Sequence, residues 1–316
     1  MDFSAALPTF VITLREGVEA ALVVGIVLAC LKKAKAEQLY SWVFAGIVAG
    51  IVASALVGVL FSWGIQVLSA TYPQYATVIK PLVVAVFGVI AIALLSWMLI
   101  WMTQQARSLK GEIEGNITSA IQQGTNAAWG VFGLIFIAVL REGFETVVFI
   151  FAQFQEGFIP VLGALGGLVG AVVIGFFLFK WGVKINIRQF FQVMGVLLLL
   201  IVAGLVVGAL RHFDQAVVAL TQINSQYEGL CFYYDQLAKN PSCILGPMVW
   251  DTTHVLPDNQ FPGVVLKALL GYRSRLYLVQ AAAYLVFLFA IGTVYFNSLT
   301  VPIAASAKDE KTTSSN

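Results

Sequence analysis

The sequence predicts an all-α integral membrane protein with seven transmembrane helices. Its 316 residues are 59% hydrophobic and 11% charged, whereas about 25% of the residues are charged in typical soluble domains. Apolar runs recur along the chain, and each is long enough to cross a hydrocarbon core of about 30 Å. A five-residue charged motif occurs in the first of these runs and again in the fourth. The net charge of +2 is too small to indicate nucleic-acid binding.

The helix boundaries follow from the apolar runs and from the charges that end them. The seven expected helices cover residues 7–31, 42–67, 81–102, 127–151, 158–182, 190–210 and 276–299. The expected organisation is a first three-helix repeat (1–110), a cytoplasmic connector (111–126), a second three-helix repeat (127–210), an extracytoplasmic loop (211–275), a seventh helix (276–299) and a cytoplasmic tail (300–316).

Lysine and arginine set the expected orientation. They gather in the short segments after the first, third and fifth helices, as Lys32 and Lys33 do. The positive-inside rule then places the N-terminus outside and the C-terminus inside. Asp2 stands where a signal peptide would be basic, so we expect the first helix to remain in the mature protein. No transit peptide is apparent, which favours the inner (plasma) membrane, where the lipid bilayer is the surrounding partner.

The motif positions indicate an inverted repeat. Arg15 and Arg141 begin the two motifs, 126 residues apart, and each lies in the first helix of a three-helix set. Because three is odd, the second set must be inverted relative to the first. Many secondary transporters are built in this way, with the substrate site near the membrane midplane between the repeats.

Each motif carries three charged side chains inside a predicted membrane helix, where charge has a high free-energy cost. At about 100° per residue, Glu16 and Glu19 share one helix face, and Arg15 lies one turn from Glu19. A charge near the bilayer centre costs about 2.5–3.5 kcal/mol on insertion scales. A purely structural Arg–Glu pair is the alternative interpretation, but it leaves the second glutamate of each motif unexplained. The central glycine would let a facing helix come close.

The charges of the two motifs together indicate a cation site. The predicted metal ligands are Glu16, Glu19, Glu142 and Glu145, with Arg15 and Arg141 in support. Four carboxylates and two guanidinium groups sum to −2, which a bound cation would offset. Carboxylate oxygen is a hard donor suited to Mg²⁺, Ca²⁺, Mn²⁺ or iron. Cysteine and methionine, which soft copper prefers, do not occur within one turn of either motif.

The long polar loop offers weaker candidates. An ion-capture site could use Asp235, Asp251, His254 and Asp258, although an ordinary solvated loop is the better-supported interpretation. Cys231 and Cys243 share this loop and are either a disulfide or two thiols. Trp101, near the inner end of the third helix, is expected to serve packing or the aromatic belt.

The motifs carry a family resemblance. Leu14–Glu19 (LREGVE) and Leu140–Glu145 (LREGFE) resemble the doubled REGxE signature of the oxidase-dependent iron permease family, which includes fungal high-affinity and bacterial Efe-type iron-uptake permeases. The resemblance implies a transporter rather than an enzyme, with iron as its substrate and no permanently bound cofactor. It implies that the transported ion is ferric iron. A ferroxidase or peroxidase partner would produce this ion by oxidising ferrous iron, or a periplasmic iron-donor protein would deliver it. Homo-oligomerisation is left open.

Two other functions compete with iron transport. The same carboxylates could pass another cation such as lead or manganese. A membrane redox or haem protein is disfavoured, because His212 and His254 both fall outside the expected helices. The sequence has no phosphate-binding loop of the GxxxxGK[ST] type, so the energy would come from an ion gradient, the membrane potential or a coupled oxidation.

Overall fold

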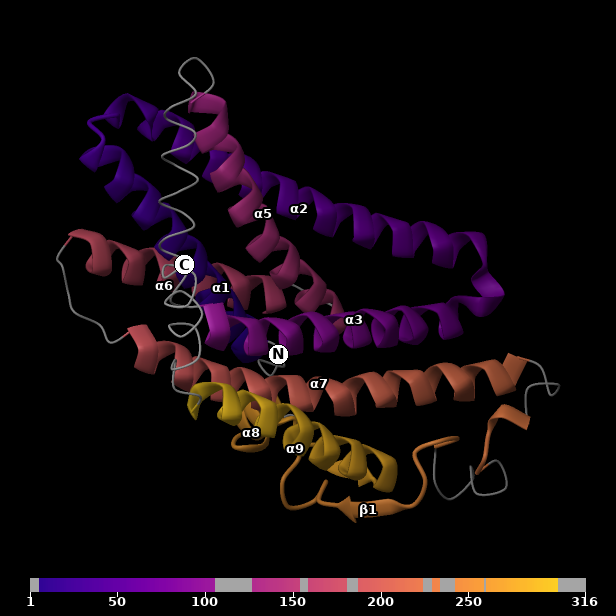
Figure 1. Ribbon diagram of the computed structural model, residues 1–316. Coiled ribbons are helices and arrows are strands. Elements are labelled where there is room, and N and C mark those ends of the chain that lie inside the picture. Colours follow the sequence, from indigo (N-terminus) through magenta and orange to yellow (C-terminus); the bar gives the residue numbers. More distant parts are fainter. Residues whose placement is uncertain are drawn as a thin grey trace, which may run out of the picture.

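The computed structural model describes residues 6–105, 127–153, 159–180, 187–223, 229–233, 242–258 and 260–300, and most of these are helical (Figure 1). The long helices are α1 (Ala6–Lys33), α2 (Tyr40–Thr71), α3 (Ala76–Gln105), α5 (Ala127–Gln153), α6 (Ile159–Lys180), α7 (Ile187–Ile223) and α9 (Leu278–Thr300). The shorter elements are η2 (Glu37–Leu39), η3 (Pro73–Tyr75), β1 (Met248–Asp251), α8 (Gly263–Leu270) and β2 (Arg275–Tyr277).

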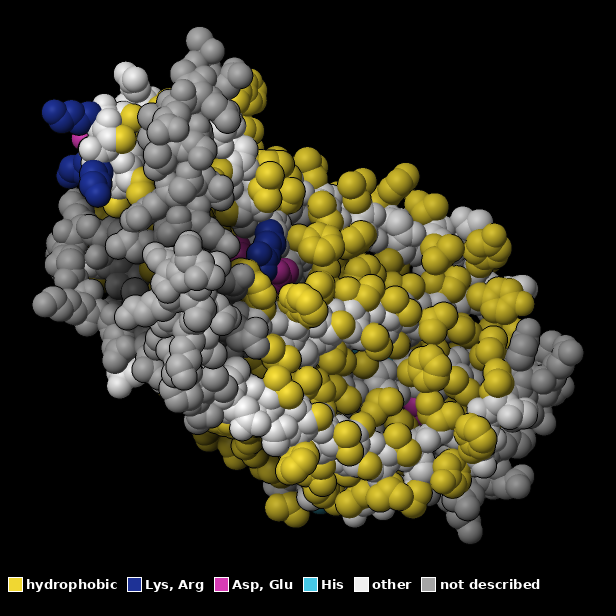
Figure 2. All heavy atoms as spheres, viewed as in Figure 1, with side chains coloured by type: hydrophobic (Ala, Val, Ile, Leu, Met, Phe, Trp, Pro, Cys, Tyr) yellow, Lys and Arg dark blue, Asp and Glu magenta, His cyan; other side chains and the backbone are white. Residues whose placement is uncertain are grey.

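Five helices in the described part of the chain are long and apolar enough to cross a membrane, namely α2, α3, α6, α7 and α9. Helices α1 and α5 are of similar length, with 28 and 27 residues, but each carries the three charges of one motif. Hydrophobic side chains cover most of the part of this face that the described residues form (Figure 2). The architecture therefore agrees with the predicted all-α membrane class.

The long helices pack in pairs. Helix α1 lies against α6, α5 lies against α2, and α3 lies against α7. The two motif helices, α1 and α5, also contact each other, and α9 packs on α7 (Figure 1). The main hydrophobic core draws on α1, α3, α5, α7 and α9, and includes Ile12, Leu95, Phe149, Leu198 and Tyr295. This core fixes α1 beside α5.

Glycines bring the paired helices into close contact, as the sequence predicted for the central motif positions. A Cβ built on Gly17 would lie 2.6 Å from Cβ of Ala171 on α6. One built on Gly143 would lie equally close, at 2.6 Å, to Cβ of Ser54 on α2. Such distances leave no room for a side chain. Each motif therefore sits at a close approach between its helix and the partner helix.

The segment after residue 210 is more structured than the sequence indicated. The sequence predicts that this helix ends near Leu210 and that His212 lies in the loop after it. The structure corrects both predictions, because α7 continues to Ile223 and includes His212. Asp214 explains the extension, since its Oδ1 accepts hydrogen bonds from the backbone N–H groups of Cys243 (2.9 Å) and Ile244 (2.8 Å). The later part of the loop thus binds the last, polar turns of α7, which the composition of the sequence alone would place in a solvated loop.

The rest of this segment folds into a small layer beside α7 and α9. Strands β1 and β2 pair antiparallel, with Met248 opposite Tyr277 and Asp251 opposite Arg275. A disulfide joins Cys231 to Cys243, with their Cα atoms 4.5 Å apart, which decides between the two alternatives for these cysteines. The predicted all-α class therefore needs one amendment, a two-stranded sheet outside the long helices.

Candidate metal centre

The two motifs meet where α1 contacts α5. Glu16, Glu19 and Glu142 each offer one carboxylate oxygen, and these three oxygens lie within 4.8 Å of one another. The oxygen ligands of hard divalent cations lie about 2.0–2.6 Å from the ion, so ligands up to about 5 Å apart can share it. Among the described residues, this is the group of acidic, histidine or cysteine side chains close enough to hold a metal ion.

The first motif is deeply buried and internally paired. Nη1 of Arg15 lies 3.0 Å from Oε1 of Glu16, and its Nη2 lies 3.0 Å from Oε1 of Glu19. Arg15 and Glu16 are each only 1% exposed. One guanidinium thus pairs with both carboxylates of its motif.

The second motif is built differently. Arg141 donates from Nε to Oε1 of Glu145 at 3.3 Å, and 47% of the Arg141 side chain is exposed. Its guanidinium carbon lies 5.2 Å from the ring centroid of Trp101 on α3, a cation–π distance. Arg141 therefore engages one glutamate of its motif and leaves Glu142 to the cluster with Glu16 and Glu19.

Several buried oxygens of the site have unused lone pairs. Oε2 of Glu16, Glu142 and Glu145 are buried and accept no hydrogen bond from the described residues. A buried polar atom without a partner costs about 1–3 kcal/mol, and more when it is charged. A bound cation would supply the missing interaction. The donor set, oxygen without sulfur or imidazole, suits a hard cation.

The candidates in the polar loop are not drawn into this group. Asp235 lies outside the described residues. Asp251 accepts hydrogen bonds from the Thr253 hydroxyl and backbone N–H and pairs with Arg275 at 3.1 Å, which holds the pKa of its exposed carboxyl below the usual range. Oδ1 of Asp258 accepts the N–H of Ser274 at 2.6 Å, while His254 is exposed. The described members of this set serve local loop structure or face solvent.

Sequence reasoning missed two neighbours of the site. The sequence indicates packing or the aromatic belt for Trp101, whereas the structure shows it as the aromatic partner of Arg141. Ser54 was not singled out, although it faces the Gly143 backbone, and its hydroxyl donates to the carbonyl oxygen of Gly50 at 2.9 Å. The contact between Arg141 and Trp101 could have been suspected from the sequence, because Arg141 lies in a membrane helix and Trp101 lies near the inner end of α3. Nothing in the sequence pointed to the second.

Comparison with known proteins places the chain in a family. Ferrous iron permease EfeU from Yersinia pseudotuberculosis is 29% identical, over 93% of each chain. EfeU from Escherichia coli O6:K15:H31 is 31% identical, over 88% of this chain and 91% of that one. An uncharacterized protein from Synechocystis is 50% identical, over 95% and 96% of the two chains. No solved structure matches. The profile of the Iron permease FTR1 family matches residues 6–301, and the chain belongs to that family.

Proposed function

We propose that this protein is a high-affinity iron permease that passes iron into the cytoplasm through a carboxylate site shared by α1 and α5. The observation that carries the proposal is the convergence of Glu16, Glu19 and Glu142, from two motifs far apart in the chain, at distances that fit one ion. Glu145 lies outside this group of three and pairs with Arg141, and we include it in the proposed site as the fourth carboxylate of the two motifs. The membership of an iron permease family supports iron as the cargo.

The helix pairing supports an inverted repeat. In an inverted repeat, α1, α2 and α3 would correspond to α5, α6 and α7. A twofold axis would then relate the α1–α6 contact to the α5–α2 contact, and the structure has both contacts. The same axis maps the α1–α5 and α3–α7 contacts onto themselves. With α1 and α5 as charged spans beside the five apolar ones, the chain crosses the inner membrane seven times, N-terminus outside. The carboxylate site then lies at the repeat interface, as in many transporters.

The proposal also specifies the oxidation state of the transported iron. We propose ferric iron, produced by a partner oxidase or delivered by a periplasmic donor protein, because clustered carboxylates are hard ligands that suit a trivalent ion. The names of the EfeU relatives speak of ferrous iron, which makes ferrous iron the second candidate. Three positive charges moved inward across 100 mV would gain about 7 kcal/mol if uncompensated.

Uptake of ⁵⁵Fe tests the proposal. Cells lacking their own iron uptake would carry this chain or its Glu16→Gln and Glu142→Gln variants at equal membrane levels, with Glu37→Gln as the control, since Glu37 is exposed on η2. We expect uptake by the wild type and by the control and its loss in both motif variants. Uptake that persists in the motif variants would contradict a shared carboxylate site.

The same assay identifies the cargo. Iron kept ferrous with ascorbate is compared with iron supplied as a ferric chelate, each with and without excess manganese or lead. Competition by manganese or lead would keep the site but change the cargo to another cation. Faster uptake of ascorbate-reduced iron, in cells without an oxidase, would replace ferric with ferrous iron.

A further inference from the structure

Bulky apolar side chains follow the glutamates on both motif helices, toward the end where α1 begins and α5 ends. Ile12 lies four residues before Glu16 on α1, and Phe149 lies four residues after Glu145 on α5. Residues four apart share a helix face and are separated by about 6 Å along the axis. Ile12 and Phe149 are each 0% exposed. On this side, the carboxylates are therefore followed within one turn by fully buried apolar groups.

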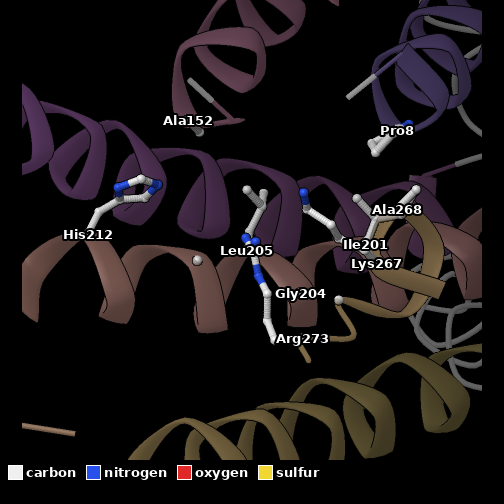
Figure 3. A pocket seen from close by; sticks show the side chains of 11 residues that line it. Pro8, Ala152, Ile201, Gly204, Leu205, His212, Lys267, Ala268 and Arg273 are labelled. Atoms are coloured by element: carbon white, nitrogen blue, oxygen red, sulfur yellow. The ribbon is translucent and has the colours of Figure 1, made fainter. Parts of the chain in front are cut away.

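A small cavity lies about one turn farther along both helices. It has a volume of about 40 Å³, and Pro8 of α1 and Ala152 of α5 line it together with residues of α7 and α8 (Figure 3). Because a water needs about 10–15 Å³, the cavity has room for water. Leu205 of α7 lines the cavity and belongs to the same hydrophobic core as Ile12 and Phe149. This core thus borders the cavity on one side and the glutamates on the other.

The opposite side of the glutamates is packed less tightly. In the proposed inverted repeat, the offset of 126 residues pairs Ile12 with Ala138 and Phe149 with Val23. Ala138 and Val23 are smaller than their counterparts, and both are only partly buried. The two sides of the carboxylate site are therefore not equivalent, although the repeat would make them so.

Two further pairs of residues show the same asymmetry. Val27 and Ile135 are 0% exposed, but they lie about two turns from the nearest glutamate, on the side of Val23 and Ala138. Arg15 is 1% exposed, whereas 47% of the side chain of its counterpart Arg141 is exposed. Fully buried apolar packing therefore begins one turn from the carboxylates on the side of the cavity and two turns from them on the other.

We propose that Ile12 and Phe149 form the outer gate of the carboxylate site and that the structure shows this gate closed. The proposal rests on the proposed passage of a cation through the glutamates, with the start of α1 outside. A hydrated ion loses its solvation in a packed apolar layer, and apolar constrictions close ion pathways in this way. Entry from the cavity then requires Ile12 and Phe149 to separate, and exit follows the less tightly packed side, as alternating access requires.

The accessibility of a single thiol tests the gate without any iron transport. The reporter is Glu142→Cys in a Cys30→Ser background, in which Cys231 and Cys243 remain joined as a disulfide. Spheroplasts are treated with a small cationic methanethiosulfonate that does not cross membranes. Mass spectrometry follows the rate at which the reporter thiol is modified, and protein unfolded in detergent gives the rate without a barrier.

We expect slow modification from outside while the gate is intact. Adding Phe149→Ala or Ile12→Ala should raise the rate by about tenfold or more, because the lost packing increases the fraction of molecules with an open gate. Phe149→Leu and Ile12→Val should raise it less, and they serve if gel filtration shows that an alanine variant fails to fold. Phe289→Ala and Ile137→Ala are the matched controls, since these residues are 77% and 65% exposed. They should leave the rate unchanged.

Inside-out vesicles separate a gate from a general loosening of the fold. Truncation of Ile12 or Phe149 should leave the rate from the inner side unchanged. Equal increases from both sides would overturn the proposal, as would equal rates from outside with the gate intact and truncated. A failure of the proposed iron transport is seen in ⁵⁵Fe uptake instead, and it leaves the labelling result in force for whichever cation the glutamates pass.

Discussion

Glu16 of α1 and Glu142 of α5 bring carboxylate oxygens within 4.8 Å of each other, although they belong to motifs in different parts of the chain. Two carboxylates at this distance repel each other unless a proton or a cation lies between them. Each also has a buried Oε2 that accepts no hydrogen bond from the described residues. The pair is therefore where the two motifs act as one unit.

If Glu16 and Glu142 hold the same ion, their substitutions should not be additive. We expect Glu16→Gln and Glu142→Gln each to reduce ⁵⁵Fe uptake by about tenfold or more, and the double variant to be no worse than the poorer single one, because the site is already lost. Initial uptake rates at equal protein levels measure this. Effects that multiply in the double variant would mean that the two glutamates act at separate sites.

The two motif arginines should differ in their importance for stability. Arg15 is 1% exposed and contacts two carboxylates, whereas the Arg141 side chain is 47% exposed and contacts one. Removing one partner of a buried charge pair costs about 3–5 kcal/mol, while an exposed pair is worth about 0–1 kcal/mol. Arg15→Gln should therefore lower the Tm in detergent far more than Arg141→Gln. Equal changes in Tm would contradict this asymmetry.

The glutamate cluster could be anticipated because local rules decide most of it. Spacing on a helix puts Glu16 and Glu19 on one face, and the cost of charge in a membrane requires that face to be used. The meeting of Glu142 with them needed only the assumption that two similar motifs share a site. Whether the cluster binds iron remains a prediction that uptake must test.

Other features depend on contacts that no local pattern contains. The turn of α7 around Asp214 is helical because a distant segment, at Cys243 and Ile244, donates hydrogen bonds to it. The different surroundings of Arg15 and Arg141 arise from their neighbours in space, such as Trp101, while the motif letters are nearly the same. The contact of Gly271, at the end of α8, with Gly204 of α7 likewise depends on how α8 folds back onto α7.

The close approach of α1 to α6 leads to a swap experiment. Gly17→Ala places a methyl group 2.6 Å from Cβ of Ala171, so the helices must separate and the Arg15 pairs must shift. We expect a lower Tm and slower iron uptake. Adding Ala171→Gly removes the opposing methyl group and should restore most of both.

Gly133→Ala is the control for helix propensity, since a Cβ there meets nothing within 4 Å. It should leave uptake unchanged and, if anything, raise stability, because alanine favours a helix over glycine by about 1 kcal/mol. A Gly17→Ala variant that behaves like Gly133→Ala would show that the close approach is unimportant.

The cysteines test the proposed orientation. Cys231 and Cys243 form a disulfide in the segment that we place outside, whereas Cys30 keeps its thiol near the end of α1 that we place inside. A membrane-impermeant maleimide applied to intact spheroplasts should label nothing at first, and should label Cys231 and Cys243 after reduction. Mass spectrometry of the labelled peptides identifies the sites. Cys231→Ser with Cys243→Ser is the control, since it should abolish the labelling. Labelling of the loop cysteines only in inside-out vesicles would reverse the orientation, and with it the direction in which iron reaches the glutamates.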